Sequence, residues 1–142
     1  MDSEKETRRY LLRYHDAAHN IESLTAEKER IEGTIYSLTA NLSDSGGGGG
    51  SSSGDKIGDG VARLCDIVDQ INAEIIMYQK SREEVRRVIN RVKDVNITLG
   101  QCLHYRYIDS KSAFAVANDM GFSTRQERRV HRQALEVASR YM

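Results

Sequence analysis

Four arginines near the C-terminus are the residues of this chain best suited to bind a polyanion. They share residues 125–132 with one acid, Glu127, and are Arg125, Arg128, Arg129 and Arg132. Ser123, just before them, is a favourable helix N-cap, and Gln126 follows three residues later to complete a capping box. Positive charge in the first turns of a helix opposes the helix dipole, which favours anions there. The pattern therefore indicates an external polyanion that supplies the missing negative charge.

The residues before the basic segment complete a helix-turn-helix pattern. Residues 112–120 read as a short helix, and Gly121 is suited to end it in the left-handed conformation. The small Ala117 would let the two helices approach closely. The second helix of such a motif enters the major groove of DNA, so we expect Arg128 to contact a base and Arg132 a phosphate. The alternative is an ordinary helical hairpin with a solvated basic face.

Apolar residues at three- and four-residue steps predict the buried faces of these helices. The basic helix carries its stripe away from the arginines, at Val130, Ala134, Val137 and Tyr141. An earlier helix should start where a longer one ends or bends, around Val95-Asn96, and its stripe is Leu99, Leu103 and Tyr107. Ser110 or Ser112 would cap the short helix that follows. Residues 96–142 are therefore predicted to form a three-helix head.

Two matched seven-residue repeats precede the head and predict a coiled-coil stem. In residues 4–42 the seam is Tyr14, Ile21, Lys28, Ile35 and Leu42 at a, with Tyr10, Ala17, Leu24, Ile31 and Leu38 at d. In residues 61–95 it is Val61, Val68, Ile75, Arg82 and Ile89 at a, with Leu64, Ile71, Tyr78, Val85 and Val92 at d. Ile67, Val88 and Val95 widen this second stripe.

Residues 43–60 between the two repeats are rich in Gly, Ser and Asp and are predicted to be a flexible loop. A flexible loop between matched apolar seams predicts an antiparallel helical hairpin over residues 1–95. The rival is a parallel dimer with the loop exposed. Two helices alone bury only a small apolar core, so we expect the stem to form a homodimer or to dock on another protein. The fold class is therefore all-α, a hairpin stem followed by a helix-turn-helix head.

Other features of the sequence argue against several classes of function. No arrangement of nucleophile, base and oxyanion donors is visible, so we expect neither an enzyme nor a cofactor. His15 and His19 have metal-ligand spacing on a helix but fall on the outer face, where we expect them to be solvated. Cys65 and Cys102 are interpreted as small core thiols of a reducing compartment. No apolar run approaches a membrane span, so a cytoplasmic protein is expected.

At these residues the chain resembles a known family. Leu103-x-x-Arg106-Tyr107, Val116-Ala117-x-x-Met120-Gly121-Phe122-Ser123 and Ala134-Leu135 resemble region four of bacterial sigma factors, which reads the promoter −35 element. The order of elements is similar to the ArpU/RinA-like phage transcriptional regulators. The resemblance implies that Thr124, Arg125, Arg128 and Arg129 face the groove. It also implies that Glu127 occupies a position where the motif has a branched apolar residue facing the first helix of the motif.

The function that we predict is sequence-specific binding of double-stranded DNA in transcription regulation, by a phage or prophage protein in a bacterial cytoplasm. The residues predicted to contact DNA are Ser123, Thr124, Arg125, Arg128, Arg129 and Arg132. The resemblance also implies contact with host RNA polymerase. Two alternatives stay open. One is a coiled-coil adaptor whose head binds protein, and the other is a recognition subunit for phage DNA packaging, resembling a small terminase.

Overall fold

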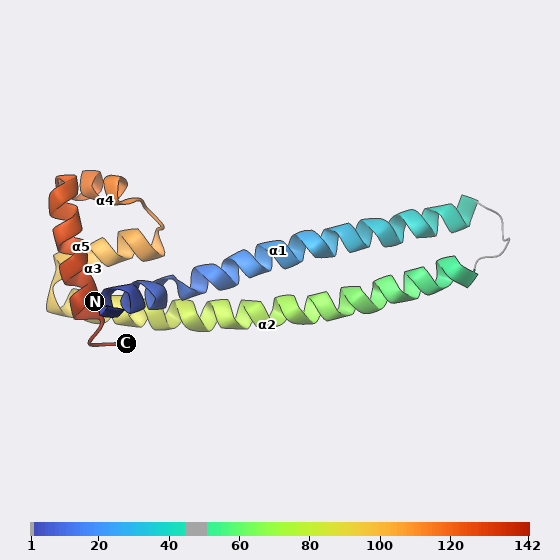
Figure 1. Ribbon diagram of the computed structural model, residues 1–142, viewed down its shortest axis with the longest axis horizontal. Coiled ribbons are helices and arrows are strands. Elements are labelled where there is room, and N and C mark those ends of the chain that lie inside the picture. The colour runs from blue at the N-terminus through green and yellow to red at the C-terminus, as the bar shows by residue number, and fades with distance from the viewer. Residues whose placement is uncertain (1, 45–50) are drawn as a thin grey trace. The chain divides into compact units, whose positions relative to one another are not determined.

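The computed structural model describes residues 2–44 and 51–142, and all regular structure in these ranges is helical (Figure 1). This confirms the predicted all-α class. The elements are α1 (Asp2–Asp44), α2 (Ser51–Val95), α3 (Ile97–Leu103), the π-helical η1 (His104–Ile108), α4 (Ala113–Met120) and α5 (Thr124–Ala138).

The chain divides into two compact units that cut across the predicted boundary between residues 95 and 96. Unit 1 contains residues 1–15 and 79–142, and unit 2 contains residues 16–78. The last turns of α2 belong with the head because their apolar side chains are buried in unit 1. These side chains are Val85, Val88, Ile89 and Val92.

The flexible loop predicted at residues 43–60 is too long. α1 continues to Asp44 and α2 begins at Ser51, so residues 43–44 and 51–60 are helical, while residues 45–50 lie outside the described part of the chain. Gly60 shows one reason. A Cβ at this glycine would lie 3.0 Å from Cγ1 of Ile35, so the absence of a side chain lets the two helices come close. Packing of this kind overrides the low helix propensity of glycine.

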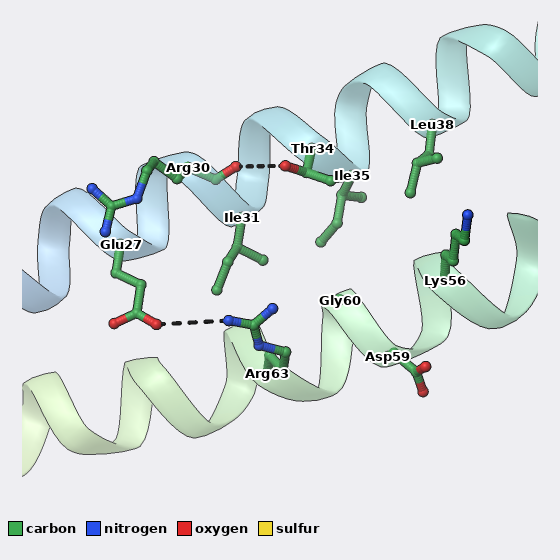
Figure 2. Close-up of a pocket in the computed structure, with 10 residues that line it drawn as sticks. All are labelled: Glu27, Arg30, Ile31, Thr34, Ile35, Leu38, Lys56, Asp59, Gly60 and Arg63. Atoms are coloured by element: carbon green, nitrogen blue, oxygen red, sulfur yellow. Dashed lines mark hydrogen bonds and ion pairs between the residues drawn. The ribbon is translucent and has the colours of Figure 1, made fainter.

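Within unit 2, α1 and α2 lie side by side and run in opposite directions (Figure 1). Glu27 pairs with Arg63 at 3.7 Å, whereas Ile35, further along α1, meets Gly60, which precedes Arg63 in α2. Figure 2 shows apolar side chains of α1 projecting toward α2 beside the Glu27–Arg63 pair. They line a groove of about 670 Å³ and are Ile31, Ile35 and Leu38.

The buried face of α2 is rotated relative to the predicted heptad. The predicted d residues are all buried or half-buried. At the a positions, however, Val61 and Ile75 are 45% and 36% exposed. Three of the positions preceding a are buried instead, and they are Ile67, Ser81 and Val88. Val95 also precedes an a position but is 56% exposed, so the prediction that it widens the buried stripe is wrong. The burial of Ile67 and Val88 agrees with the prediction that they widen the stripe, whereas Ser81 was missed because it is polar and does not register as apolar.

In unit 1, α2 ends at Val95 and the chain turns sharply into α3, as predicted. Asn96 has an extended backbone, with φ −155° and ψ 112°, and its side-chain oxygen accepts hydrogen bonds from the N–H groups of Thr98 and Leu99. Gly100 then lies against α2, where a Cβ would stand 2.7 Å from the Cα of Lys93. This corner sets α3 directly against the end of α2.

The predicted stripe of Leu99, Leu103 and Tyr107 is buried in unit 1. The first turns of α1 join this core. The Tyr14 hydroxyl donates a hydrogen bond to the carbonyl oxygen of Tyr107, and Nε2 of His15 lies 3.2 Å from the same oxygen. The expectation that His15 is solvated is therefore wrong, because its half-buried ring packs beside Tyr14 and reaches η1.

Candidate nucleic-acid interface

The turn between α4 and α5 has the geometry that the sequence predicted. Ser112 caps α4, since its hydroxyl accepts the N–H of Ala115 at 3.2 Å. Gly121 ends α4 in the left-handed region with φ 70°, and the N–H of Phe122 bonds to the carbonyl of Ala117 at 2.7 Å. Ser123 caps α5 by accepting the N–H of Gln126 at 3.1 Å. These bonds fix the direction in which α5 leaves the turn.

The buried face of α5 is rotated relative to the predicted apolar stripe. Val130, Val137 and Tyr141 are only half-buried. The fully buried residues are Glu127, His131, Ala134, Leu135 and Ala138. Two of these are polar, so apolar periodicity alone places the face wrongly. The face packs against α3 and α4.

Each of the two polar residues on this face has a side-chain partner, although Oε2 of Glu127 has no hydrogen-bond partner within the described residues. Oε1 of Glu127 accepts a hydrogen bond from the Arg106 guanidinium at 3.2 Å, and the thiol of Cys102 lies 3.8 Å from the same oxygen. The Tyr107 hydroxyl lies 2.7 Å from Nε2 of His131, and the two rings stack with centroids 5.7 Å apart. A buried ion pair and a buried hydrogen bond thus connect η1 to α5.

Burial disfavours the charged forms of three of these groups and so shifts their pKa values. It raises the pKa of the Cys102 thiol to about 12, with a further contribution from the Glu127 carboxylate. It also raises the pKa of Tyr107 to about 12. Burial lowers the pKa of His131 to about 3, and the positive charges of Arg106 and Arg8 add to this effect. His131 is therefore neutral, and its Nε2 and the Tyr107 hydroxyl share one hydrogen bond.

All six residues predicted to contact DNA are exposed and lie in the first nine residues of α5 or just before the helix. Helical spacing places Arg125 and Arg129 on the side opposite the buried face. Arg128 and Arg132 lie nearer the edge of that face, where they line a pocket with Arg8 of α1. This placement makes Arg125 and Arg129 better suited than Arg128 to face outward. The six residues are Ser123, Thr124, Arg125, Arg128, Arg129 and Arg132.

Some residues near this surface were outside the sequence prediction. Arg8 and Glu4 come from the first turns of α1, about 120 positions away from α5 in the sequence. No local pattern connects such distant residues, and only the folded unit brings them together.

The prediction that both cysteines are core thiols is correct for Cys102, which is buried, and wrong for Cys65, which is exposed.

In the described ranges, no cluster of three or more His, Cys, Asp or Glu side chains is arranged to hold a metal ion. The same ranges contain no helix with an apolar stretch long enough to cross a membrane. Comparison of the chain with family models, curated proteins and solved structures finds no match. The case for a function therefore depends on the geometry of α4, α5 and the surrounding charges.

Proposed function

We propose that this chain is a DNA-binding transcriptional regulator that places α5 in the major groove of double-stranded DNA. In this proposal, the antiparallel segments of α1 and α2 form a hairpin stem, and α3, α4 and α5 form a helix-turn-helix head. The protein acts by binding and not by catalysis. The resemblance to sigma region four and to ArpU/RinA-like regulators adds a phage or prophage origin and contact with RNA polymerase.

The observation that carries the proposal is the division of α5 into two faces. Its buried face is anchored by Ala134 and Leu135, while its exposed positions carry four arginines. Within residues 2–44 and 51–142, none of Arg125, Arg128, Arg129 and Arg132 forms an ion pair. A helix held rigidly on one side and unpaired on the other suits a groove of negative charge.

The charge of the surrounding chain supports a localised footprint. Residues 96–142 contain seven Lys and Arg against four Asp and Glu, whereas the whole chain has 21 of each. The basic excess is therefore concentrated in the part that carries α5. Electrostatic attraction to phosphates then favours this face over the rest of the surface.

The test starts with selection of bound duplexes from a random library, followed by gel shifts with the selected duplex and a scrambled one. Arg125→Ala and Arg129→Ala should each weaken binding to the selected duplex by about 1–3 kcal/mol and relax the preferred sequence. Arg30→Ala is the matched control, because Arg30 is an exposed arginine of unit 2. This control should leave both the affinity and the preference unchanged.

Two outcomes would replace the proposal. If the parent protein enriches no duplex and binds both probes only at background, the adaptor alternative takes its place. If the enriched fragments come from a phage packaging site and not from promoters, the proposal is replaced by the alternative of a recognition subunit for DNA packaging.

A further inference from the structure

A pocket of about 200 Å³ joins the first turns of α1 to η1 and α5 within unit 1. Four of the side chains that line it are arginines, and they come from three different elements. The charged and titratable residues lining the pocket are Glu4, Arg8, Arg106, Arg128, His131 and Arg132. Such a concentration of guanidinium groups around one concave surface is unusual, because like charges repel each other unless an anion lies between them.

The protein's own acids neutralise only part of this charge. Glu4 pairs with Arg8 at 2.9 Å, and the buried Glu127 pairs with Arg106 at 3.2 Å. Arg128 and Arg132 form no ion pair in the described parts of the chain. Two acids against four arginines leave two positive charges at the pocket without a counter-charge.

The buried His131 also lines the pocket, and the positive charges of the arginines affect its pKa. Arg106 and Arg8 both contribute to lowering the pKa of His131, after burial, which is the largest cause. His131 is therefore neutral and does not add to the repulsion among the arginines. Arg106 has a side chain only 19% exposed and is held by Glu127, so its position in the cluster is fixed. Part of the site is thus rigid before any ligand arrives.

We propose that this pocket binds a phosphate group, held by Arg8, Arg106, Arg128 and Arg132. Planar guanidinium groups form paired hydrogen bonds to phosphate oxygens, and a cluster of them is the usual protein site for a phosphate. Two sources of the phosphate share this chemistry: the DNA backbone beside α5, and a free phosphate or phosphate ester. The first source rests on the proposed function and would extend the DNA contact to α1. The second source does not depend on the proposed function.

The first arm of the test measures binding of inorganic pyrophosphate by calorimetry, at constant ionic strength set with sodium chloride. The parent should bind, and Arg8→Gln should weaken binding about tenfold or more, as expected for loss of a charge-assisted contact. Arg9→Gln is the matched control, because Arg9 is the adjacent exposed arginine of α1 and does not line the pocket. Glu4→Gln should act in the opposite direction and tighten binding, since it removes the acid that competes for Arg8.

The second arm identifies the source by gel shifts with a selected duplex at several salt concentrations. If a backbone phosphate occupies the pocket, Arg8→Gln should lower the slope of log affinity against log salt by about one, while Arg9→Gln should not.

The outcomes separate the pocket from the proposed function. Pyrophosphate binding that depends on Arg8, with no DNA binding by the parent, supports the pocket with a free phosphate as its ligand and refutes the proposed function. DNA binding in which Arg8→Gln and Arg9→Gln behave alike, with no pyrophosphate binding, overturns the pocket and leaves the proposed function standing. Equal pyrophosphate affinity in the two variants also overturns it.

Discussion

The environment of Glu127 shows how unit 1 accommodates a carboxylate in its core. The side chain is fully buried at the position where the resemblance implies a branched apolar residue. Taken alone, the sequence suggests a costly unpaired acid, so replacing it with an apolar residue should stabilise the protein. The structure changes that expectation, because Arg106 reaches Oε1 from η1. Removing one partner of a buried pair leaves the other charge uncompensated.

We therefore expect Glu127→Leu to lower the free energy of unfolding by about 1–3 kcal/mol. The double variant Glu127→Leu with Arg106→Met should recover most of this loss, since replacing both partners of a buried pair by apolar groups is often neutral. Urea unfolding of the two single variants and the double variant measures the coupling. Glu136→Leu is the exposed control on the same helix. A single Glu127→Leu variant more stable than the parent would show that the pair does not stabilise the fold.

His131 gives unit 1 a defined dependence on pH. Its pKa is about 3 in the folded protein, well below the ordinary value of 6.5. In the unfolded chain the imidazole binds a proton below pH 6.5, but in the folded protein it does not until about pH 3. Stability is therefore complete above pH 6.5 and falls as the pH drops toward 3, by on the order of 1 kcal/mol per pH unit at most.

Urea midpoints at pH 7.5, 6.0 and 5.0 should decrease in the parent and decrease less steeply in His131→Gln. Glutamine keeps an acceptor near the Tyr107 hydroxyl but does not titrate. His19→Gln serves as the control, because His19 is exposed. Parallel slopes for the parent and His131→Gln would contradict the account.

At the scale of elements, Gly100 controls the corner between α2 and α3. A Cβ at this position would stand 2.7 and 2.8 Å from backbone atoms of Lys93, which cannot move away without bending α2. We expect Gly100→Ala to destabilise unit 1 by about 1–3 kcal/mol, as overpacking usually does. Gly33→Ala is the control, because no atom lies within 4 Å of its Cβ. That change should instead stabilise α1 by about 1 kcal/mol. Thermal melts followed by circular dichroism measure both effects, and an equal gain in the two variants would refute the close approach.

The elements that the sequence predicted best are those whose signals are local. Gly121, Ser123 and the break after Val95 all depend on the conformational preferences of one or two residues, and the structure has them where the pattern placed them. Helix faces were predicted less well, because apolar periodicity cannot recognise buried polar residues. Ser81 on α2 and His131 on α5 are buried but were not part of the predicted apolar stripes.

In the candidate site, too, the features with local signals were predicted and those that depend on distant contacts were not. The exposure of the α5 arginines followed from the cap and the spacing, which are read from neighbouring residues. The contribution of Arg8 to the pocket beside Arg128 did not, because it requires contacts between the two ends of the chain. Contacts between residues so far apart in the sequence are determined by tertiary packing and cannot be predicted from a local sequence pattern.

At the scale of the whole molecule, the first turns of α1 belong to the same compact unit as residues 79–142. Thr7, Leu11 and Tyr14 are buried there, and Tyr14 bonds to the backbone of η1. The stability of the head should therefore depend on residues that are about one hundred positions away in the sequence. This dependence separates an integrated unit from a head that folds by itself on the end of a stem.

The adjacent pair Leu11 and Leu12 tests this dependence with two changes of the same chemistry. Leu11 is fully buried and Leu12 is 42% exposed. Leu11→Ala should lower the free energy of unfolding by about 2–5 kcal/mol, whereas Leu12→Ala should cost much less. Native-state hydrogen exchange shows which helices lose stability. If unit 1 opens as a whole, Leu11→Ala will accelerate exchange of the protected amides in α3 and α5 as well as in α1, by about tenfold for each 1.4 kcal/mol. Acceleration confined to α1 would mean that residues 96–142 hold their structure independently of the N-terminal turns, and the phosphate pocket would then have only the arginines of η1 and α5.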